Sequence, residues 1–378
     1  MKHSNNAVVY VSIQYRLGAY GFLGSSEYVE QGGATNLGLF DQRAALLWVQ
    51  NHISAFGGDP TKVTIIGDSA GGGSVTAQLM WDGGEKYPPF RTAIAQYPWW
   101  QRYSSEEQLR NQYQYLLETT NCTNLDCMKS LSEDKLADAT QATFERGRIE
   151  GAYGYGTFFY GPYISRPAIQ FLPSQAFAAG NFSKVPLLTF HSPWEGFGFT
   201  PPNINETGQA IDLLQQFPNA KKGFFQRFYE LYPSEEFENT FWQRQTWFSD
   251  FIVNCPTQVL ASSFVAHGVP VWKMIFNAGS KKHGAASPFL FDLDWVVSER
   301  GDAKISNVLK DWVVSFGVHG DPNAQSWRSD DKRRWPVYGI KGDIVTINDT
   351  VVGTSSDGWF DDSERCRFWA KSSDATQN

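Results

Sequence analysis

The sequence contains a Gly-x-Ser-x-Gly pentapeptide at residues 67–71, between two contrasting segments. The apolar run Val63–Ile66 before it is typical of a strand, and the run 72–79 after it is typical of a helix. A strand, a sharp turn and a helix form the setting in which a serine hydroxyl is exposed as a nucleophile. Glycines on either side suit such a turn because they carry no side chain that would clash. The pentapeptide alone fits an ordinary surface turn, so the flanking elements are what favour Ser69 as a nucleophile.

A serine nucleophile needs a general base, and the sequence has six histidines. In a parallel α/β sheet the catalytic groups gather at the carboxyl ends of the strands, so we expect the base on a loop just after a strand. His283 follows the strand-like run Val269–Phe276 in a small-residue loop and meets this condition best. His191 also follows a strand-like run, and topology alone leaves it open. The other histidines are expected at the surface or in turns: His3, His52, His267 and His319.

The base in turn needs a carboxylate that holds its tautomer and stabilises the imidazolium. Glu195 comes a few residues after the strand-like run Val185–Phe190, so the same strand-end argument favours it. Most acidic residues are solvated surface groups, which is the alternative for Glu195. The chain order Ser69, Glu195, His283 matches the order of α/β-hydrolases, in which Ser precedes Asp or Glu and His comes last. The sequence therefore predicts a Ser-Glu-His triad.

Length and composition limit the classes of protein that the chain can represent. Its 378 residues are 42% hydrophobic, enough for a large core in one α/β domain or two smaller ones. A net charge of -7 gives no basic surface for nucleic acid and disfavours anionic membranes. We find no apolar run of about 18 residues, as a transmembrane helix would need. The opening residues 1–6 lack the plan of a signal peptide, so we expect neither segment in this chain.

Strand-like apolar runs alternate with helical stretches along the chain. The run Ala7–Ile13 is almost continuously β-branched or aromatic, as expected for a strand buried on both faces of a parallel sheet. Helical spacing of apolar residues covers Asp41–His52 and Ile305–Phe316. The alternation predicts an α/β fold with a mostly parallel central sheet and helices on both faces. The expected strands are Ala7–Ile13, Val63–Ile66, Thr92–Gln96, Val185–Phe190 and Val269–Phe276.

Aromatic residues make up 15% of the chain, including 14 Trp and 28 Phe. The segment Tyr153–Gly161 interleaves aromatic rings with glycines, which suits a flexible apolar wall better than a packed helix. An aromatic-lined cavity or groove is one explanation, and an aromatic-rich core is the other. A wall of this kind would favour an apolar or aromatic ester.

Three further segments make a family resemblance specific: Tyr15–Gly18 with Gly21–Leu23, Asn36–Arg43, and Phe56–Pro60 running into the pentapeptide. With these motifs the chain resembles the type-B carboxylesterases, which include cholinesterases and the large fungal lipases, over essentially its whole length. The resemblance implies a single α/β-hydrolase domain over residues 1–378. In this family the acid is a glutamate followed by glycine, matched by Glu195-Gly196. The base is a histidine followed by glycine, matched by His283-Gly284.

The resemblance implies hydrolysis of a small-molecule or lipid ester through an acyl-enzyme, with no cofactor. Ser69 would attack the carbonyl, His283 would take and return the proton, and Glu195 would orient His283. The backbone N–H of Ala70, the residue after the serine, would help to hold the oxyanion. The alternative hypothesis is a catalytically impaired or inactive esterase-like protein that binds partners, as adhesion relatives in this family do.

The resemblance also pairs the four cysteines, Cys122 with Cys127 and Cys255 with Cys366. From the residues alone, reduced buried thiols remain the alternative. No histidine stands beside either pair, so no metal site is expected. Four Asn-x-Ser/Thr sequons agree with a secreted glycoprotein in an oxidising compartment. These sequons begin at Asn121, Asn181, Asn205 and Asn348.

The sequence also departs from the family pattern. Family members complete the oxyanion hole with a Gly-Gly loop upstream of the Tyr-Arg-Leu-Gly segment, and no such loop precedes Ala7. We therefore expect an N-terminally incomplete chain that lacks the N-terminal strands, one of them central in the sheet. The tripeptide Gln96-Tyr97-Pro98 stands where the family has Gln-Ser-Gly. Asp68 replaces the commoner glutamate, which is expected to matter little.

Overall fold

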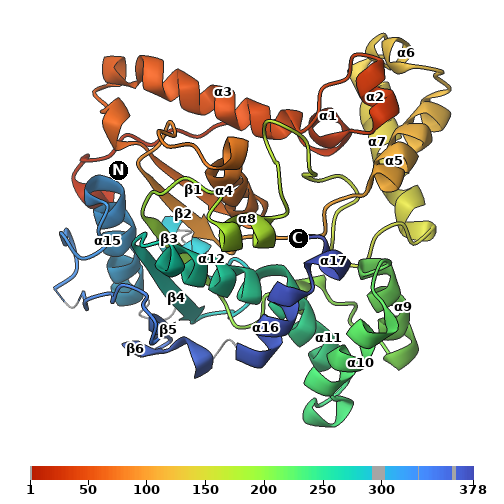
Figure 1. Ribbon diagram of the computed structural model, residues 1–378. Coiled ribbons are helices and arrows are strands. Elements are labelled where there is room, and N and C mark those ends of the chain that lie inside the picture. The colour runs from red at the N-terminus through yellow and green to blue at the C-terminus, as the bar shows by residue number, and fades with distance from the viewer. Residues whose placement is uncertain (1, 292–302, 331, 360–362) are drawn as a thin grey trace.

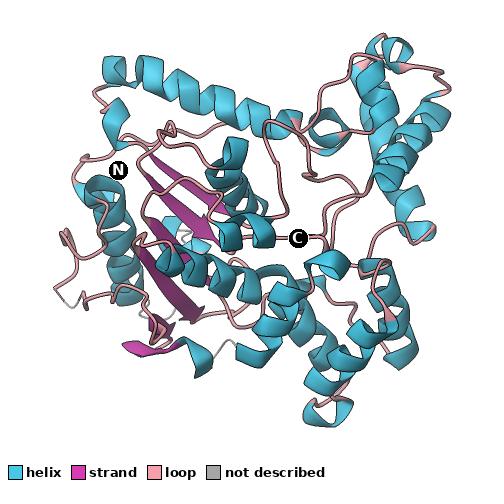
Figure 2. Cartoon of the chain, viewed as in Figure 1, coloured by secondary structure: helices cyan, strands magenta, loops and turns pink. Residues whose placement is uncertain are grey.

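The computed structural model describes residues 2–291, 303–330, 332–359 and 363–378 (Figure 1). Within these residues, six strands form one sheet whose spatial order is the order of the sequence, β1-β2-β3-β4-β5-β6. The first five strands are parallel, and β6 pairs with β5 in the antiparallel sense. Figure 2 shows the sheet at the centre of the chain, with helices around it. The strands are β1 (Thr64–Asp68), β2 (Thr92–Gln96), β3 (Leu187–His191), β4 (Val271–Asn277), β5 (Asp343–Asn348) and β6 (Val352–Ser356).

Both faces of the sheet are covered, because neighbouring residues of one strand enter different hydrophobic clusters. On β2, Ile94 packs into the cluster that includes the apolar side chains of α15 (Ala303–His319). Ala93 and Ala95 pack on the opposite face, with side chains from α4 (Ala70–Met80), α8 (Pro173–Ala179) and α12 (Cys255–Ala266). The predicted α/β fold, with a mostly parallel sheet and helices on both sides, is confirmed.

The remaining helices cover the edges of this core (Figure 1). Two groups of helices lie beside the sheet. One consists of α2, α5, α6 and α7, and the other of α9, α10 and α11. Helix α3 packs on α4, α13 on α15 and α16 on α12. No helix in the described ranges is both long and apolar enough to cross a membrane. The bounds are α1 (Gly18–Phe22), α2 (Ser26–Glu30), α3 (Leu37–His52), α5 (Glu106–Thr120), α6 (Leu125–Lys129), α7 (Glu133–Ile149), α9 (Glu206–Gln216), α10 (Lys222–Leu231), α11 (Thr240–Ser249), α13 (Ser287–Phe291), α16 (Ser363–Lys371) and α17 (Ser373–Thr376).

The prediction of a strand at Ala7–Ile13 is wrong. The segment forms no ladder, and four of its large side chains, from Val9 to Ile13, are between 36% and 57% exposed. A strand exists only through hydrogen bonds to a neighbour. In the described part of the chain the sheet ends at β1, and the segment pairs with none of its strands. The apolar run therefore has the composition of a strand without the partner that would make it one.

Smaller differences concern the ends of elements. The other four predicted strands form within two residues of their expected bounds, as β1 to β4. The hairpin of β5 and β6 was not predicted, although β5 buries apolar residues on both faces, Ile344 on one and Val345 and Ile347 on the other. His319 is the last residue of α15 rather than part of a turn.

Two disulfides join helices, in the pairs that the resemblance implied. Cys122 is bonded to Cys127, which links the end of α5 to α6. Cys255 is bonded to Cys366 across 111 residues and fastens α16 to α12. No cysteine is left unpaired, since all four lie in the described ranges.

Candidate active site

Ser69 occupies the turn between β1 and α4 with a strained backbone, at φ 59° and ψ -120°. A residue other than glycine adopts a positive φ only where surrounding structure enforces it. Here the Ser69 N–H donates to the carbonyl of Gln96 over 3.0 Å, and the Trp99 N–H donates to the Ser69 carbonyl over 3.3 Å. The last residue of β2 and the segment after it therefore hold the serine in this conformation.

The glycines around Ser69 are not equally necessary. A Cβ on Gly67 would lie 2.2 Å from the carbonyl oxygen of Gly71, and one on Gly72 would lie 2.3 Å from that of Gln96. A Cβ on Gly71 would meet nothing within 4 Å. The expectation that both glycines of the pentapeptide prevent a clash is therefore right for Gly67 and wrong for Gly71, where a Cβ would point into open space.

The structure brings the three predicted triad residues together. The Oγ of Ser69 lies 2.7 Å from Nε2 of His283, although 214 residues separate them. The other imidazole nitrogen, Nδ1, bonds to Oε2 of Glu195. Ser69 follows β1, Glu195 follows β3 and His283 follows β4, so parallel strands place all three at the same edge of the sheet. This is the arrangement in which imidazole can accept a serine proton while a carboxylate fixes its tautomer.

Glycines after the acid and the base allow these two loops to form. Glu195 is fully buried, and the Ser192 N–H donates to its Oε1. A Cβ on Gly196 would lie 2.4 Å from the carbonyl oxygen of Gln245, so only glycine lets this loop approach α11. Gly284 has φ 78°, a conformation that a side chain disfavours.

Charge around the imidazole favours its protonated form. Burial alone would lower the pKa of His283, but the charge and hydrogen bond of Glu195, aided by Asp68, raise the pKa above its ordinary value. Asp68 has its own pKa raised by burial, opposed by the hydrogen bond that it accepts from Ser287 over 2.6 Å. The raised pKa makes His283 a better proton acceptor than a solvated imidazole, which is the property that a general base uses.

Aromatic rings enclose the imidazole. The ring centroids of Tyr97, Trp99 and Phe199 lie 5.4, 5.3 and 5.4 Å from that of His283. Phe158, from the predicted aromatic segment 153–161, packs edge-on against Trp99 at 6.1 Å. We call Trp99, Phe158 and Phe199 the aromatic wall.

Only Phe158 of this wall was anticipated from the sequence. Trp99 lies three residues after β2 and Phe199 lies four residues after Glu195, so strand-end position could have signalled both. The buried Tyr97, part of the departure from the family pattern, accepts a hydrogen bond from Ala286 N–H over 2.7 Å. It thereby helps to hold the loop that carries His283.

The other histidines bond away from Ser69. His191 ends β3, is buried, and bonds through Nδ1 to the backbone carbonyl of Ser192 over 2.9 Å. His3 bonds to Asp311, His267 to the carbonyl of Ala178 and His319 to Gln325, while the ring of His52 packs on Trp48. Of the candidate bases, His283 is the one that contacts the nucleophile.

The sequon asparagines differ in exposure. Asn121, Asn205 and Asn348 are exposed, whereas Asn181 is half-buried. Asn121 ends α5 in a left-handed conformation. Asn205 caps α9 by accepting the Gly208 N–H over 2.8 Å. Asn348 is the last residue of β5, and its Oδ1 accepts the Val351 N–H over 2.7 Å in the turn to β6.

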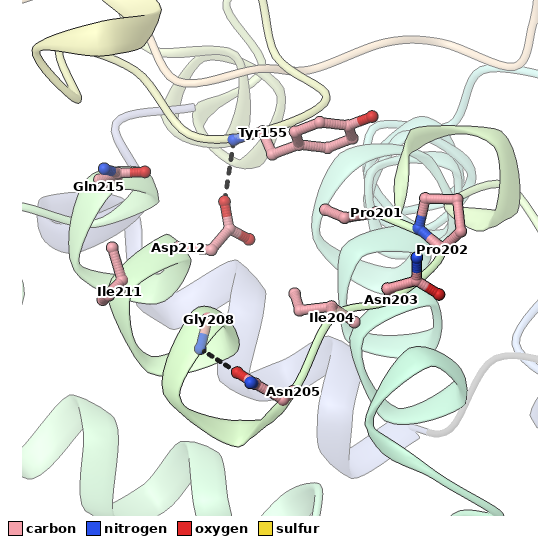
Figure 3. Close-up of a pocket in the computed structure, with 10 residues that line it drawn as sticks. All are labelled: Tyr155, Pro201, Pro202, Asn203, Ile204, Asn205, Gly208, Ile211, Asp212 and Gln215. Carbon is pink, nitrogen blue, oxygen red and sulfur yellow. Dashed lines mark hydrogen bonds between the residues drawn. The ribbon is translucent and has the colours of Figure 1, made fainter.

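Two surface cavities lie beside the aromatic segment rather than at the triad. The first, of about 460 Å³, is lined by residues that include Tyr155, Ile204 and Asp212. Figure 3 shows the carboxylate of Asp212 bonded to the Tyr155 N–H. The second, of about 420 Å³, includes Phe158 among its lining residues. Within the described ranges, no group of three His, Cys, Asp or Glu side chains could hold a metal ion.

Comparisons with known proteins agree with this geometry. A profile of the carboxylesterase family matches residues 1–369. The chain is 29% identical to carboxylesterase patB of Aspergillus clavatus over 380 residues. This alignment covers 98% of this chain and 65% of patB. It is 32% identical over 245 residues to the secreted triacylglycerol lipase LIP1 of Gibberella zeae, covering 60% of this chain and 40% of the lipase.

A solved structure resembles the whole described fold. The crystal structure of Aspergillus niger EstA matches with a TM-score of 0.85 at 25% identity, over 100% of this chain and 76% of EstA. The matches to patB and LIP1 each cover less than two thirds of the relative's length, so this chain corresponds to only part of these two proteins.

Proposed function

The chain belongs to the carboxylesterase family, and on that premise we propose that it hydrolyses carboxylic esters through an acyl-enzyme formed on Ser69. The observation that supports this best is the 2.7 Å contact between Ser69 Oγ and His283 Nε2, with Glu195 bonded to the other nitrogen. A serine hydroxyl in this setting can lose its proton as it attacks.

In the first half of the reaction, Ser69 Oγ attacks the ester carbonyl carbon and its proton passes to His283 Nε2. The carbonyl oxygen becomes an oxyanion, to which the N–H of Ala70 at the start of α4 donates. The tetrahedral adduct then collapses, the bond to the alcohol oxygen breaks, and His283 returns the proton to that oxygen. In the second half a water molecule repeats the sequence and releases the acid. Glu195 stays ionised throughout and stabilises the imidazolium.

The substrate that suits this site is a small-molecule or lipid ester with an apolar group. The aromatic wall offers rings and no charged side chain to whatever lies against His283. We further propose that the protein is secreted. The two disulfides support this, because disulfides persist in oxidising compartments, and a relative is named a secreted lipase.

The test is a fluorophosphonate probe, which forms a covalent bond only with an activated serine, together with p-nitrophenyl acetate turnover. We expect the purified chain to be labelled, and Ser69→Ala to lose both labelling and turnover. Ser130→Ala removes an exposed hydroxyl from the end of α6 and serves as the matched control. Labelling that survives in Ser69→Ala would exclude the mechanism, whereas a folded chain that is never labelled would favour a non-catalytic binding protein.

A further inference from the structure

Arg244, on α11, is fully buried and bonds to three separate segments. Its Nη1 donates to the carbonyl of Phe199 over 2.7 Å, and its Nη2 donates to the carbonyl of Tyr155 over 2.7 Å. Its Nε and Nη2 donate to Oδ2 of Asp212 on α9, over 3.1 and 3.0 Å. One guanidinium therefore fixes the backbone after Glu195, the aromatic segment 153–161 and α9.

Asp212 completes this arrangement. It is only 5% exposed, and its Oδ1 accepts the Tyr155 N–H over 2.8 Å (Figure 3). Tyr155 is thus held through its N–H by Asp212 and through its carbonyl by Arg244. Next to it, Gly156 has φ 84°, and a Cβ there would lie 2.7 Å from the Phe199 carbonyl oxygen. The aromatic segment therefore packs closely against the Phe199 carbonyl, which also accepts a hydrogen bond from Arg244.

One of the residues whose backbone Arg244 holds, Phe199, belongs to the aromatic wall. Phe199 packs against the imidazole of His283 and lies 4.6 Å from Trp99 between ring centroids. Arg244 also lies over the ring of Phe248 at 4.0 Å, and Phe248 packs on Trp99 at 6.0 Å. The guanidinium touches none of the reacting groups, but the positions of Phe199 and Phe158 depend on the backbone that it holds.

We propose that Arg244 is a positioning residue that fixes the aromatic wall close to Ser69 and so restricts the acyl group to unbranched or flat shapes. The acyl group is the part of the ester concerned, because it stays attached to Ser69 Oγ in the acyl-enzyme. That oxygen lies 2.7 Å from the imidazole against which Trp99 and Phe199 pack. This inference rests on the proposed esterase activity, and it adds how that site selects its substrate.

The geometry of the guanidinium explains why lysine would be a partial substitute. Arg244 reaches acceptors in three directions with nitrogens of one rigid plane. An ammonium group would keep the charge opposite Asp212, but a single nitrogen cannot span the carbonyls of Phe199 and Tyr155 in the same way. We expect Arg244→Lys to behave between the wild type and Arg244→Met.

The test compares kcat/KM for p-nitrophenyl acetate with that for p-nitrophenyl pivalate, whose acyl group is branched. Both rates come from one preparation, so a loss of folded protein cancels in their ratio. We expect Arg244→Met to lower the acetate-to-pivalate ratio at least about fivefold, since single-methylene differences in apolar pockets reach this size. Arg244→Lys should show a smaller shift. Arg227→Met, which removes exposed ion pairs with Glu230 and Glu364, should leave the ratio unchanged.

An unchanged ratio in an active Arg244→Met variant would overturn the inference and leave the esterase proposal intact. If Arg244→Met does not fold, Arg244→Lys decides the question by the same ratio. A wild-type chain without serine-dependent turnover would instead defeat the proposed function, so the two failures are distinguishable.

Discussion

The hydroxyl of Ser287 donates a hydrogen bond to Oδ2 of Asp68 over 2.6 Å. This contact joins the residue before the nucleophile to the segment that follows His283. Asp68 also contributes to the raised pKa of His283. Asp68, which replaces the family's usual glutamate, therefore affects the pKa of His283 as well as forming part of the turn around Ser69.

Replacing Asp68 with Asn should move the pH dependence of the proposed reaction. The variant can still accept the Ser287 bond, but it loses the negative charge that raises the pKa of His283. Because His283 must be neutral to accept the Ser69 proton, the acid limb of kcat/KM should shift to lower pH. Rates for p-nitrophenyl acetate between about pH 5 and 9 would measure this shift around the ordinary imidazole pKa of about 6.5. Asp59→Asn, at an exposed position, is the control, and an unmoved limb would contradict the assignment.

Glu195→Gln should lower kcat by about 1,000- to 10,000-fold, as expected when a buried triad carboxylate no longer holds the imidazole in the right tautomer. The acid limb of the remaining activity should also move to lower pH, because Glu195 is the main cause of the raised pKa of His283. Turnover normalised to circular dichroism of the folded chain is the measurement. Near wild-type turnover in a folded variant would assign Glu195 a purely structural role.

Two neighbouring glycines provide a matched pair of substitutions. Gly67→Ala would place a Cβ 2.2 Å from a backbone carbonyl oxygen, so the turn must shift and fluorophosphonate labelling should fall at least about tenfold. Gly71→Ala meets no atom within 4 Å and should be labelled at close to the wild-type rate. Equal labelling rates in the two variants would show that the turn tolerates a side chain at Gly67.

Removing the two disulfides should have unequal effects on stability. Cys255 and Cys366 close a loop of 111 residues, for which chain entropy gives about 5 kcal/mol. Cys122 and Cys127 are five residues apart, which gives about 2 kcal/mol. Double Ser variants of each pair, compared by urea unfolding, should show the larger loss for the long loop. A larger loss for the short loop would contradict the entropic account.

The sequons should accept glycans unequally if the chain passes through a secretory pathway. Asn121, Asn205 and Asn348 are exposed, and the cap made by Asn205 uses Oδ1, which leaves Nδ2 for the sugar. Asn181 is half-buried and its sequon Ser183 is fully buried, so a glycan fits there least well. Intact-mass analysis before and after peptide N-glycosidase treatment should find occupancy at the first three. Full occupancy at Asn181 alone would refute the exposure argument.

The sequence predicted those parts of the site that depend on local order. Glu195 and His283 could be found because a parallel sheet sends every strand end to one edge, and because chain order matched a known order of triad residues. Trp99 and Phe199 follow strand ends, which was the only signal for them in the sequence. Arg244 escaped prediction because its role comes from packing between segments far apart in the chain. A buried arginine on a helix has no local signal that its acceptors are the carbonyls of Tyr155 and Phe199.

The wrong strand at Ala7–Ile13 has a different cause. Composition measures how well side chains suit a sheet, but pairing requires a neighbouring strand at the right place. The run Thr92–Gln96 has a similar composition and does form a strand, β2, because β1 and β3 lie on either side of it and pair with it. The disulfide pairs came from resemblance, since spacing alone leaves three pairings of four cysteines.

The spatial order of the strands is also their order of synthesis, so each can dock on its predecessor as it leaves the ribosome. Ser69 is made with β1, but His283 arrives 214 residues later. At about 5–20 residues per second, this delay is roughly 10–40 s. Throughout that interval Ser69 lacks the imidazole to which it bonds in the folded chain, so the proposed triad is complete only after β4 and the loop that follows it have been made.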